Sequence, residues 1–309
     1  MPLVRQCLKP TTDTQSYLHV YAADYLPYLT DLESRSRPSL YLHSGGPPPA
    51  SPSAPEAGGD PATSSPLPTA SAATALHPEL TQSMRGILVD WLVELSTEYS
   101  LSPPTLYHAV SLVDRSLTKL PPVPRSQLQC LGCACTLIAA KLHEIHPPTA
   151  DDFVYISDST YTRAQITGME SRVCAALEFR LSAVTPESYL ETYALAARLP
   201  EHGIDVYRYI LELTLLDYRY LQHSPSLISA GALCVALASL RLPWTQECTH
   251  YSGRTVGELR GVVKQILASM WGAEESSLKT VFGKWKTKKV GEVALKTVPR
   301  WEEFDWMGC

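Results

Sequence analysis

Three closely spaced cysteines are the first residues whose type and spacing could do chemistry. Cys130, Cys133 and Cys135 include a C-x2-C pair, which is a zinc-binding pattern when it lies in a turn and a second ligand pair follows. These cysteines fall instead within a run of small apolar residues, and the remaining cysteines are scattered. We therefore predict that they pack in the core, and we expect no metal site.

Lys141 and Glu144, with Glu170 further along the chain, form a second candidate group. Paired charged side chains can bond the free backbone groups at the end of a partner's helix once water is excluded. Spacing alone favours a simpler interpretation, an i,i+3 pair on one helix worth about 0.2–0.5 kcal/mol. Both interpretations stay open on these residues alone.

Patterns typical of enzymes are missing from the sequence. The nine histidines form no H-E-x-x-H, and no G-x-S-x-G or phosphate-cradling glycine loop occurs. The pair Asp151 and Asp152 stands at a predicted helix start, where it complements the helix dipole. We expect a non-catalytic protein with no cofactor.

Composition narrows the class of protein further. The 309 residues are 45% hydrophobic, and 26 basic against 31 acidic residues give a formal net charge of −5. This balance argues against a nucleic-acid-binding surface, and no run of 18 apolar residues suggests a membrane span. Eight cysteines at irregular spacing favour reduced thiols. We expect a protein of the nucleus and cytoplasm, with neither nucleic acid nor membrane as a partner.

Apolar residues recur at three- and four-residue steps through most of the chain, and strand-like alternation is rare. The pattern predicts an all-α protein. Thr81 or Ser83 could cap the helix that follows them, and Thr149 a later one. The predicted helices or apolar faces cover residues 16–33, 84–95, 106–117, 125–142, 149–156, 162–178, 186–199, 204–221, 226–240, 255–270 and 275–286.

A proline-rich tract interrupts this pattern. Eight of the 25 prolines lie between residues 47 and 68, and Leu67 is the only large apolar side chain in residues 44–75. Such a tract cannot bury enough surface to offset its ordering entropy, so we predict a disordered linker, although proline-rich tracts can also bind aromatic grooves. The predicted segments are 1–43 with an amphipathic helix, 44–76, 77–184, 185–290 and a tail at 291–309.

Two segments of the predicted helices are similar to each other. Residues 131–135 align with 228–232, and Ala139 aligns with Ala236. Both segments are apolar on nearly every side and rich in small side chains, which suits a helix at the centre of a bundle. The sequence therefore predicts two tandem five-helix units.

Specific motifs then give a resemblance to a known family. Residues 84–94, MRGILVDWLVE, resemble the MRAIL-x-DWLVEV signature of mitotic cyclins, with Gly86 where alanine is usual. The motifs at 139–144 and 153–158 follow in cyclin order and spacing, and 225–230 resembles the PS-x-IAAAA run of the second cyclin box. Residues 21–33 are similar to the helix before the box in A- and B-type cyclins.

The resemblance implies a non-catalytic regulatory subunit of a cyclin-dependent Ser/Thr kinase, acting in cell-cycle control at G2/M or S phase. Such a subunit binds the kinase's regulatory helix and biases a bistable enzyme toward its competent state. The alternative is a cyclin-fold adaptor of the transcription machinery, against which the net charge of −5 argues.

Matching the family's kinase-contacting motif residue by residue gives a candidate interface. Here His143 replaces a glutamate and Leu142 a phenylalanine of the family's KFEE motif, so the choice of kinase is open. The kinase-binding residues that the resemblance implies are Lys141, Leu142, Glu144, Ile145, Glu170 and Phe179.

The family also docks R-x-L-type peptides of substrates and inhibitors on the first helix of the box. An apolar stripe containing tryptophan is otherwise typical of a buried helix face, and that alternative stays open. The docking residues that the resemblance implies are Met84, Ile87, Leu88, Trp91, Glu94, Arg125, Leu128 and Gln129.

Two short motifs bear on regulation. The basic run from Lys284 to Lys289 could be a nuclear address, although a solvated helix end fits it as well. Arg5-x-x-Leu8 is a minimal match to a destruction-box degradation signal.

Overall fold

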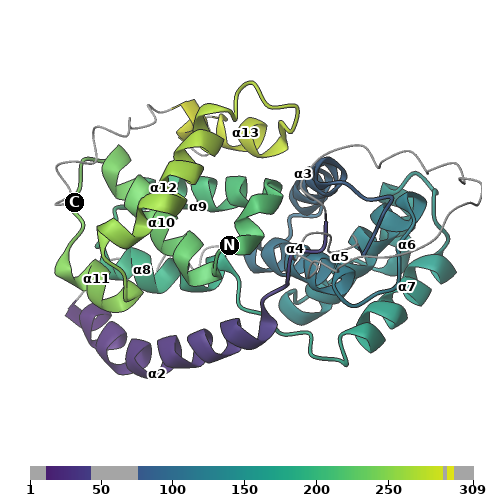
Figure 1. Cartoon of the computed structure of the whole chain (residues 1–309), viewed down its shortest axis with the longest axis horizontal. Coiled ribbons are helices and arrows are strands. Elements are labelled where there is room, and N and C mark those ends of the chain that lie inside the picture. Colours follow the sequence, from purple (N-terminus) through teal and green to yellow (C-terminus); the bar gives the residue numbers. More distant parts are fainter. Residues whose placement is uncertain (1–11, 43–75, 288–290, 296–309) are drawn as a thin grey trace, which may run out of the picture.

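The computed structural model describes residues 12–42, 76–287 and 291–295, and its regular elements within these ranges are all helices (Figure 1). The prediction of an all-α protein is confirmed. The helices are α2 (Thr12–Ser36), α3 (Gln82–Glu98), α4 (Pro103–Leu117), α5 (Leu128–His143), α6 (Ala150–Ile156), α7 (Arg163–Ala176), α8 (Leu190–Ala196), α9 (Glu201–Leu216), α10 (Pro225–Ser239), α11 (Gln246–Ser252), α12 (Val256–Trp271) and α13 (Thr280–Trp285). In the same described ranges, 3-10 turns cover Arg125–Gln127, Pro186–Tyr189, Tyr218–Gln222 and Val293–Leu295.

Helices α3–α7 gather into one unit and α8–α12 into a second, so the tandem five-helix arrangement is confirmed (Figure 1). The composition of the second unit differs from the prediction in one respect. Helix α11 was not predicted, because Cys248 is its only buried residue and leaves no apolar period. Residues 275–286, predicted as the fifth helix of this unit, instead contain the additional helix α13, which packs against α3 and α9.

Threonines start several helices, as their positions suggest. Thr81 accepts a hydrogen bond from the Met84 N–H at 3.2 Å, which satisfies one free donor of α3. Thr149 forms a reciprocal capping box with Asp152 at the start of α6. Asp152 therefore works as a cap, and Asp151 also lies in the first turn of α6, where both were predicted to complement the helix dipole.

The two small-residue segments are the central helices α5 and α10. A methyl group on Gly132 would lie 2.9 Å from Leu88, and one on Gly231 would lie 2.6 Å from Val262. A side chain at Gly231 would clash with the buried, β-branched Val262, and one at Gly132 would force the end of the Leu88 side chain to move, so the neighbouring helices approach closely at both positions. Each central helix is buried along most of its length.

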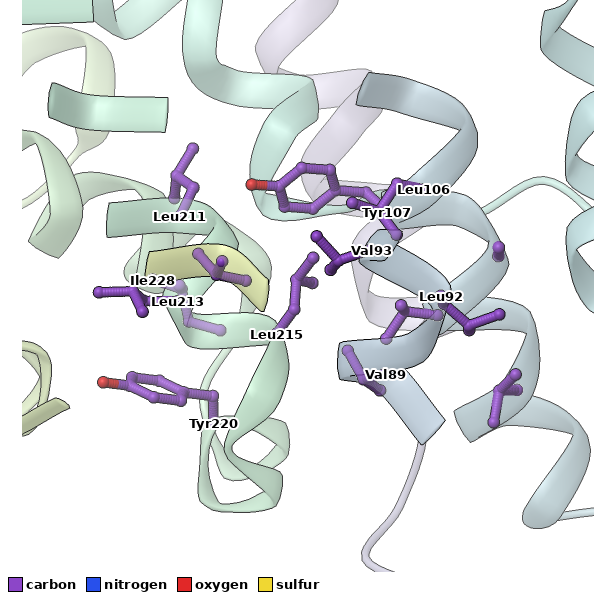
Figure 2. Packing of buried hydrophobic residues seen from close by; sticks show 14 of the residues in the cluster. Val89, Leu92, Val93, Leu106, Tyr107, Leu211, Leu213, Leu215, Tyr220 and Ile228 are labelled. Carbon is purple, nitrogen blue, oxygen red and sulfur yellow. The ribbon is translucent and has the colours of Figure 1, made fainter. Parts of the chain in front are cut away.

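The units share one continuous core. Figure 2 shows Val93 and Tyr107 of the first unit beside Leu211 and Leu215 of the second, and all four are buried. These side chains come from α3, α4 and α9, so the relative placement of the two units is fixed by apolar packing.

The segment before the first unit joins this core. Glu33 near the end of α2 is buried and accepts hydrogen bonds from the Tyr189 hydroxyl at 2.5 Å and from Ser226 in the second unit. The backbone N–H groups of Tyr41 and Leu42 both donate to the Tyr218 hydroxyl. The N-terminal helix is thus held by polar contacts as well as by packing on α8.

Several predictions lie outside the described residues. They concern the disordered linker, almost the whole of the C-terminal tail, the Arg5-x-x-Leu8 motif and the end of the basic run. Within the described ranges, no helix is long and apolar enough to cross a membrane.

Candidate functional site

Lys141 and Glu170 meet on neighbouring helices. The Lys141 Nζ lies 2.5 Å from Oε1 of Glu170, and α5 packs against α7. Half of the lysine side chain is exposed, while the carboxylate is mostly covered. The pair therefore presents an ammonium group that is already oriented, with donors left for a partner.

Exposed apolar side chains flank this ion pair in the chain. Leu142 is 50% exposed in the last turn of α5, Ile145 is 91% exposed just beyond it, and Phe179 is 74% exposed in the turn after α7. Large apolar groups left in water near a fixed charge are typical of a protein-binding surface. We call Lys141, Leu142, Ile145, Glu170 and Phe179 the α5–α7 surface.

Glu144, predicted to contact a kinase, is engaged within the chain. Its Oε1 accepts hydrogen bonds from the Ser102 N–H at 2.7 Å, the Ser102 hydroxyl at 2.8 Å and the Thr105 hydroxyl at 2.5 Å. Burial alone would raise the pKa of Glu144, but these bonds and nearby His143 outweigh it and lower the pKa. This carboxylate therefore caps the start of α4, and its predicted contact with a kinase stays a prediction.

A group of polar side chains on α4, behind this surface, was not predicted from the sequence. His108 is buried and bonds both to His143, at the end of α5, and to the Leu181 carbonyl oxygen. Arg115, also buried, donates to carbonyl oxygens of residues 180–182. In the sequence, His108 and Arg115 lie seven residues apart on the side of this helix opposite the predicted apolar face, so the periodic pattern gave no signal that they are buried.

The predicted docking residues divide between core and surface. Ile87 is 58% exposed, whereas Leu88 and Leu128 are buried, so part of the stripe is core as the alternative held. Met84 and Trp91 are half-buried and pack against the core. Among the polar members, Glu94 and Arg125 are exposed and Gln129 is half-buried.

The clustered cysteines lie in the core on α5. Cys130, Cys133 and Cys135 are free thiols and are buried. Burial raises the pKa of Cys133 to about 12, so its reactive thiolate form is suppressed. In the described part of the chain, no three histidine, cysteine, aspartate or glutamate side chains are placed to hold a metal ion.

Comparison with protein families gives a match to each unit. Residues 63–182 match the family described as cyclin, N-terminal domain, and residues 184–299 match cyclin, C-terminal domain. The two ranges together take in well over half of the chain.

The curated relatives include A-type cyclins. Cyclin-A1-1 of Arabidopsis thaliana is 40% identical over 233 residues, which are 72% of this chain and 50% of the relative. The G2/mitotic-specific cyclin-A of Hydra viridissima is 40% identical over 220 residues, 70% of this chain and 52% of the relative. The chain thus spans about half the length of these relatives.

A solved structure has a similar fold. The viral cyclin from herpesvirus saimiri superposes with a TM-score of 0.57 at 25% sequence identity, covering 62% of this chain and 86% of the viral protein.

Proposed function

Because this chain belongs to the cyclin family, we propose that it is a regulatory subunit that binds and activates a cyclin-dependent Ser/Thr protein kinase in cell-cycle control. The subunit itself has no catalytic role in this proposal. It supplies binding energy to a kinase that carries out the phosphoryl transfer.

The observation that supports the proposal most is the α5–α7 surface. A kinase's regulatory helix has free backbone groups at its exposed start, which need hydrogen-bonding partners once an interface excludes water. The Lys141–Glu170 pair offers a donor and an acceptor, and Leu142, next to Lys141 in the chain, and Phe179, in the turn after α7, are exposed apolar side chains. Exposed apolar side chains on, or just after, the same two helices as an oriented ion pair are candidates for the anchors of a binding interface.

The energy required is moderate. Shifting a kinase from a mostly inactive to a mostly active population takes a difference in binding free energy of about 5.5 kcal/mol between its two states. An interface of ordinary size can supply that difference if it contacts the regulatory helix in only one of its positions. A pre-oriented ion pair suits this task because it binds the helix in one position better than in the other.

We also propose that the exposed part of the α3 stripe docks R-x-L-type peptides of substrates and inhibitors. Ile87 offers exposed apolar surface, Met84 and Trp91 are only half-buried, and Glu94 is an exposed acid one turn beyond Trp91. An arginine of the peptide can pair with this acid, and a leucine can cover the apolar side chains. This second role would bring substrates to the activated kinase.

Localisation to the nucleus and cytoplasm is part of the proposal. The basic run gives it little support within the described residues, because Lys284 donates to Glu212 at 2.7 Å. A fluorescent fusion of the full chain, compared with a variant in which Lys286, Lys288 and Lys289 are alanine, tests whether the run directs nuclear entry.

Co-purification and a kinase assay test the main proposal. The full chain, mixed with recombinant cyclin-dependent kinases that pair with A-type cyclins, should form a complex and stimulate phosphorylation of a histone-type substrate. An electrophoretic shift assay at physiological salt separates this function from that of a transcription adaptor. Tight DNA binding without kinase activation would favour the adaptor and contradict the proposal.

A further inference from the structure

The α5–α7 surface is assembled from two separate segments. One is the end of α5, with Lys141 and Leu142 and, just beyond, Ile145. The other is α7, with Glu170, and the turn after it, with Phe179. A partner that contacts both segments needs them at one fixed separation, because a misplaced anchor loses its contact or must be reordered on binding.

His108 bonds to both segments from behind the surface. Its Nε2 lies 2.6 Å from the Leu181 carbonyl oxygen, and its Nδ1 lies 2.7 Å from Nε2 of His143. A carbonyl oxygen only accepts, so Nε2 of His108 donates, its Nδ1 accepts, and Nε2 of His143 donates to it. One neutral imidazole thus joins the last turn of α5 to the segment that follows Phe179.

The turn that His108 holds has an unfavourable backbone conformation. Glu178 and Phe179 have φ angles of +52° and +56°, in the left-handed region that side chains with a Cβ disfavour. Such a conformation persists only where surrounding contacts enforce it. Arg115, on the same helix as His108, adds hydrogen bonds to carbonyl oxygens of residues 180–182. The turn itself closes through the bond from the Phe179 N–H to the Cys174 carbonyl oxygen, and helix α4 holds the segment that directly follows Phe179.

We propose that His108 is a positioning residue for kinase binding, which fixes the separation between the end of α5 and the turn that carries Phe179. The inference rests on the proposed function of the α5–α7 surface. At 5% exposure, His108 does not reach a partner itself, so it acts through His143 and Leu181.

His77 provides a matched control. It is fully buried, its Nε2 lies 2.6 Å from the Leu117 carbonyl oxygen, and its Nδ1 accepts the Val123 N–H at 2.9 Å. Both histidines use their ring nitrogens in the same way and both contact α4 or lie on it. The bonds of His77 hold the end of α4 and the segment beyond it, which carry none of the α5–α7 surface.

The test compares four variants of the full chain by melting curve and by affinity for a recombinant cyclin-dependent kinase that pairs with A-type cyclins. His108→Leu should weaken binding about tenfold, equivalent to about 1.4 kcal/mol. The affinity of His108→Gln should lie within about threefold of the wild-type value, because the glutamine amide can both donate and accept hydrogen bonds. His77→Leu should lower the melting temperature comparably and leave affinity unchanged. Lys141→Glu should abolish binding.

The outcomes separate this inference from the proposed function. Wild-type affinity in His108→Leu together with lost binding in Lys141→Glu would overturn the positioning role alone, as would equal losses of affinity in His108→Leu and His77→Leu. No kinase binding by the wild-type chain would overturn both.

If His108→Leu does not fold, His143→Leu breaks the same link from an exposed position. Faster amide exchange of residues 178–182 in the free chain would then support the inference, and unchanged exchange there would overturn it.

Discussion

Arg85 and Asp114 form a two-bond ion pair in the interior of the protein. Nε and Nη2 of Arg85 each lie 2.8 Å from an oxygen of Asp114, and both side chains are almost completely buried. The Tyr41 hydroxyl donates to the same carboxylate at 2.6 Å, and Nη1 of Arg85 donates to the Leu215 carbonyl oxygen. The pair therefore connects the N-terminal segment, the first unit and the second unit.

Removing one member of this pair should strongly destabilise the protein. We expect Asp114→Ala to lower the free energy of unfolding by about 3–5 kcal/mol, because the guanidinium of Arg85 would remain buried without its counter-ion. Urea unfolding measures the change. The control is Asp151→Ala, which removes an exposed partner of Arg163 and should cost about 1 kcal/mol or less. Similar losses of unfolding free energy in the two variants would contradict a special stabilising role for the buried Arg85–Asp114 pair.

Glu144 should act mainly through its oxygen acceptor, with its charge contributing less. All three of its donors go to Oε1, so Glu144→Gln keeps the acceptor, whereas Glu144→Ala leaves Ser102 and Thr105 without it. At pH 7 we expect the alanine variant to lose about 1–3 kcal/mol of stability and the glutamine variant clearly less. Urea unfolding of both variants distinguishes the role of the acceptor from that of the charge. A glutamine variant as unstable as the alanine variant would show that the charge is needed.

The stability of the protein should fall in mild acid because of His108. Burial, outweighing the hydrogen bond to the Leu181 carbonyl, lowers the pKa of His108 to about 4, and His143 and Arg115 add to the effect. The unfolded chain takes up this proton near pH 6.5 and the folded chain only near pH 4, so stability is fully present above pH 6.5 and is lost as the pH falls toward 4. Unfolding titrations of wild type and His108→Leu should differ in slope across this window. If the unfolding free energy of the two proteins has the same slope against pH, His108 is not buried in its neutral form.

Ile87 and Leu88 are neighbours on α3, but Ile87 is exposed and Leu88 is buried. Substitutions at these two positions therefore distinguish a docking role from core packing. Ile87→Ala should lower the rate ratio between a docking-motif substrate and a short peptide without changing the melting temperature. Leu88→Ala should destabilise the fold by about 2–5 kcal/mol, because it leaves a cavity beside Gly132, and both substrates should suffer together. An unchanged ratio in Ile87→Ala would remove the proposed docking role.

Most of the fold could be predicted because helices with one apolar face repeat at a regular period. The small-residue runs identified α5 and α10 as central helices, and a close approach at Gly132 and Gly231 explains why. Helix α11 could not be predicted in this way, because its only buried residue is Cys248. Short helices held by a cap and one contact leave no periodic signal.

Only the family motifs allowed the candidate site to be predicted from the sequence. Spacing alone left Lys141 beside Glu144, whereas in the fold it pairs with Glu170 on another helix. Glu144 instead bonds to Ser102, 42 residues earlier in the chain. Pairings of this kind depend on how α4, α5 and α7 pack, which no local pattern in the sequence specifies.

Reversing the Lys141–Glu170 pair tests the central claim most directly. Lys141→Glu should abolish kinase co-purification and activation, at a cost of about 2–5 kcal/mol in binding, because polar groups of the partner lose their counterpart. Adding Glu170→Lys restores an ion pair within the chain but presents the wrong charge at each position to the kinase. We predict that the double variant melts like the wild type and still fails to activate the kinase. Normal kinase activity with Lys141→Glu, at an unchanged melting temperature, would contradict the account.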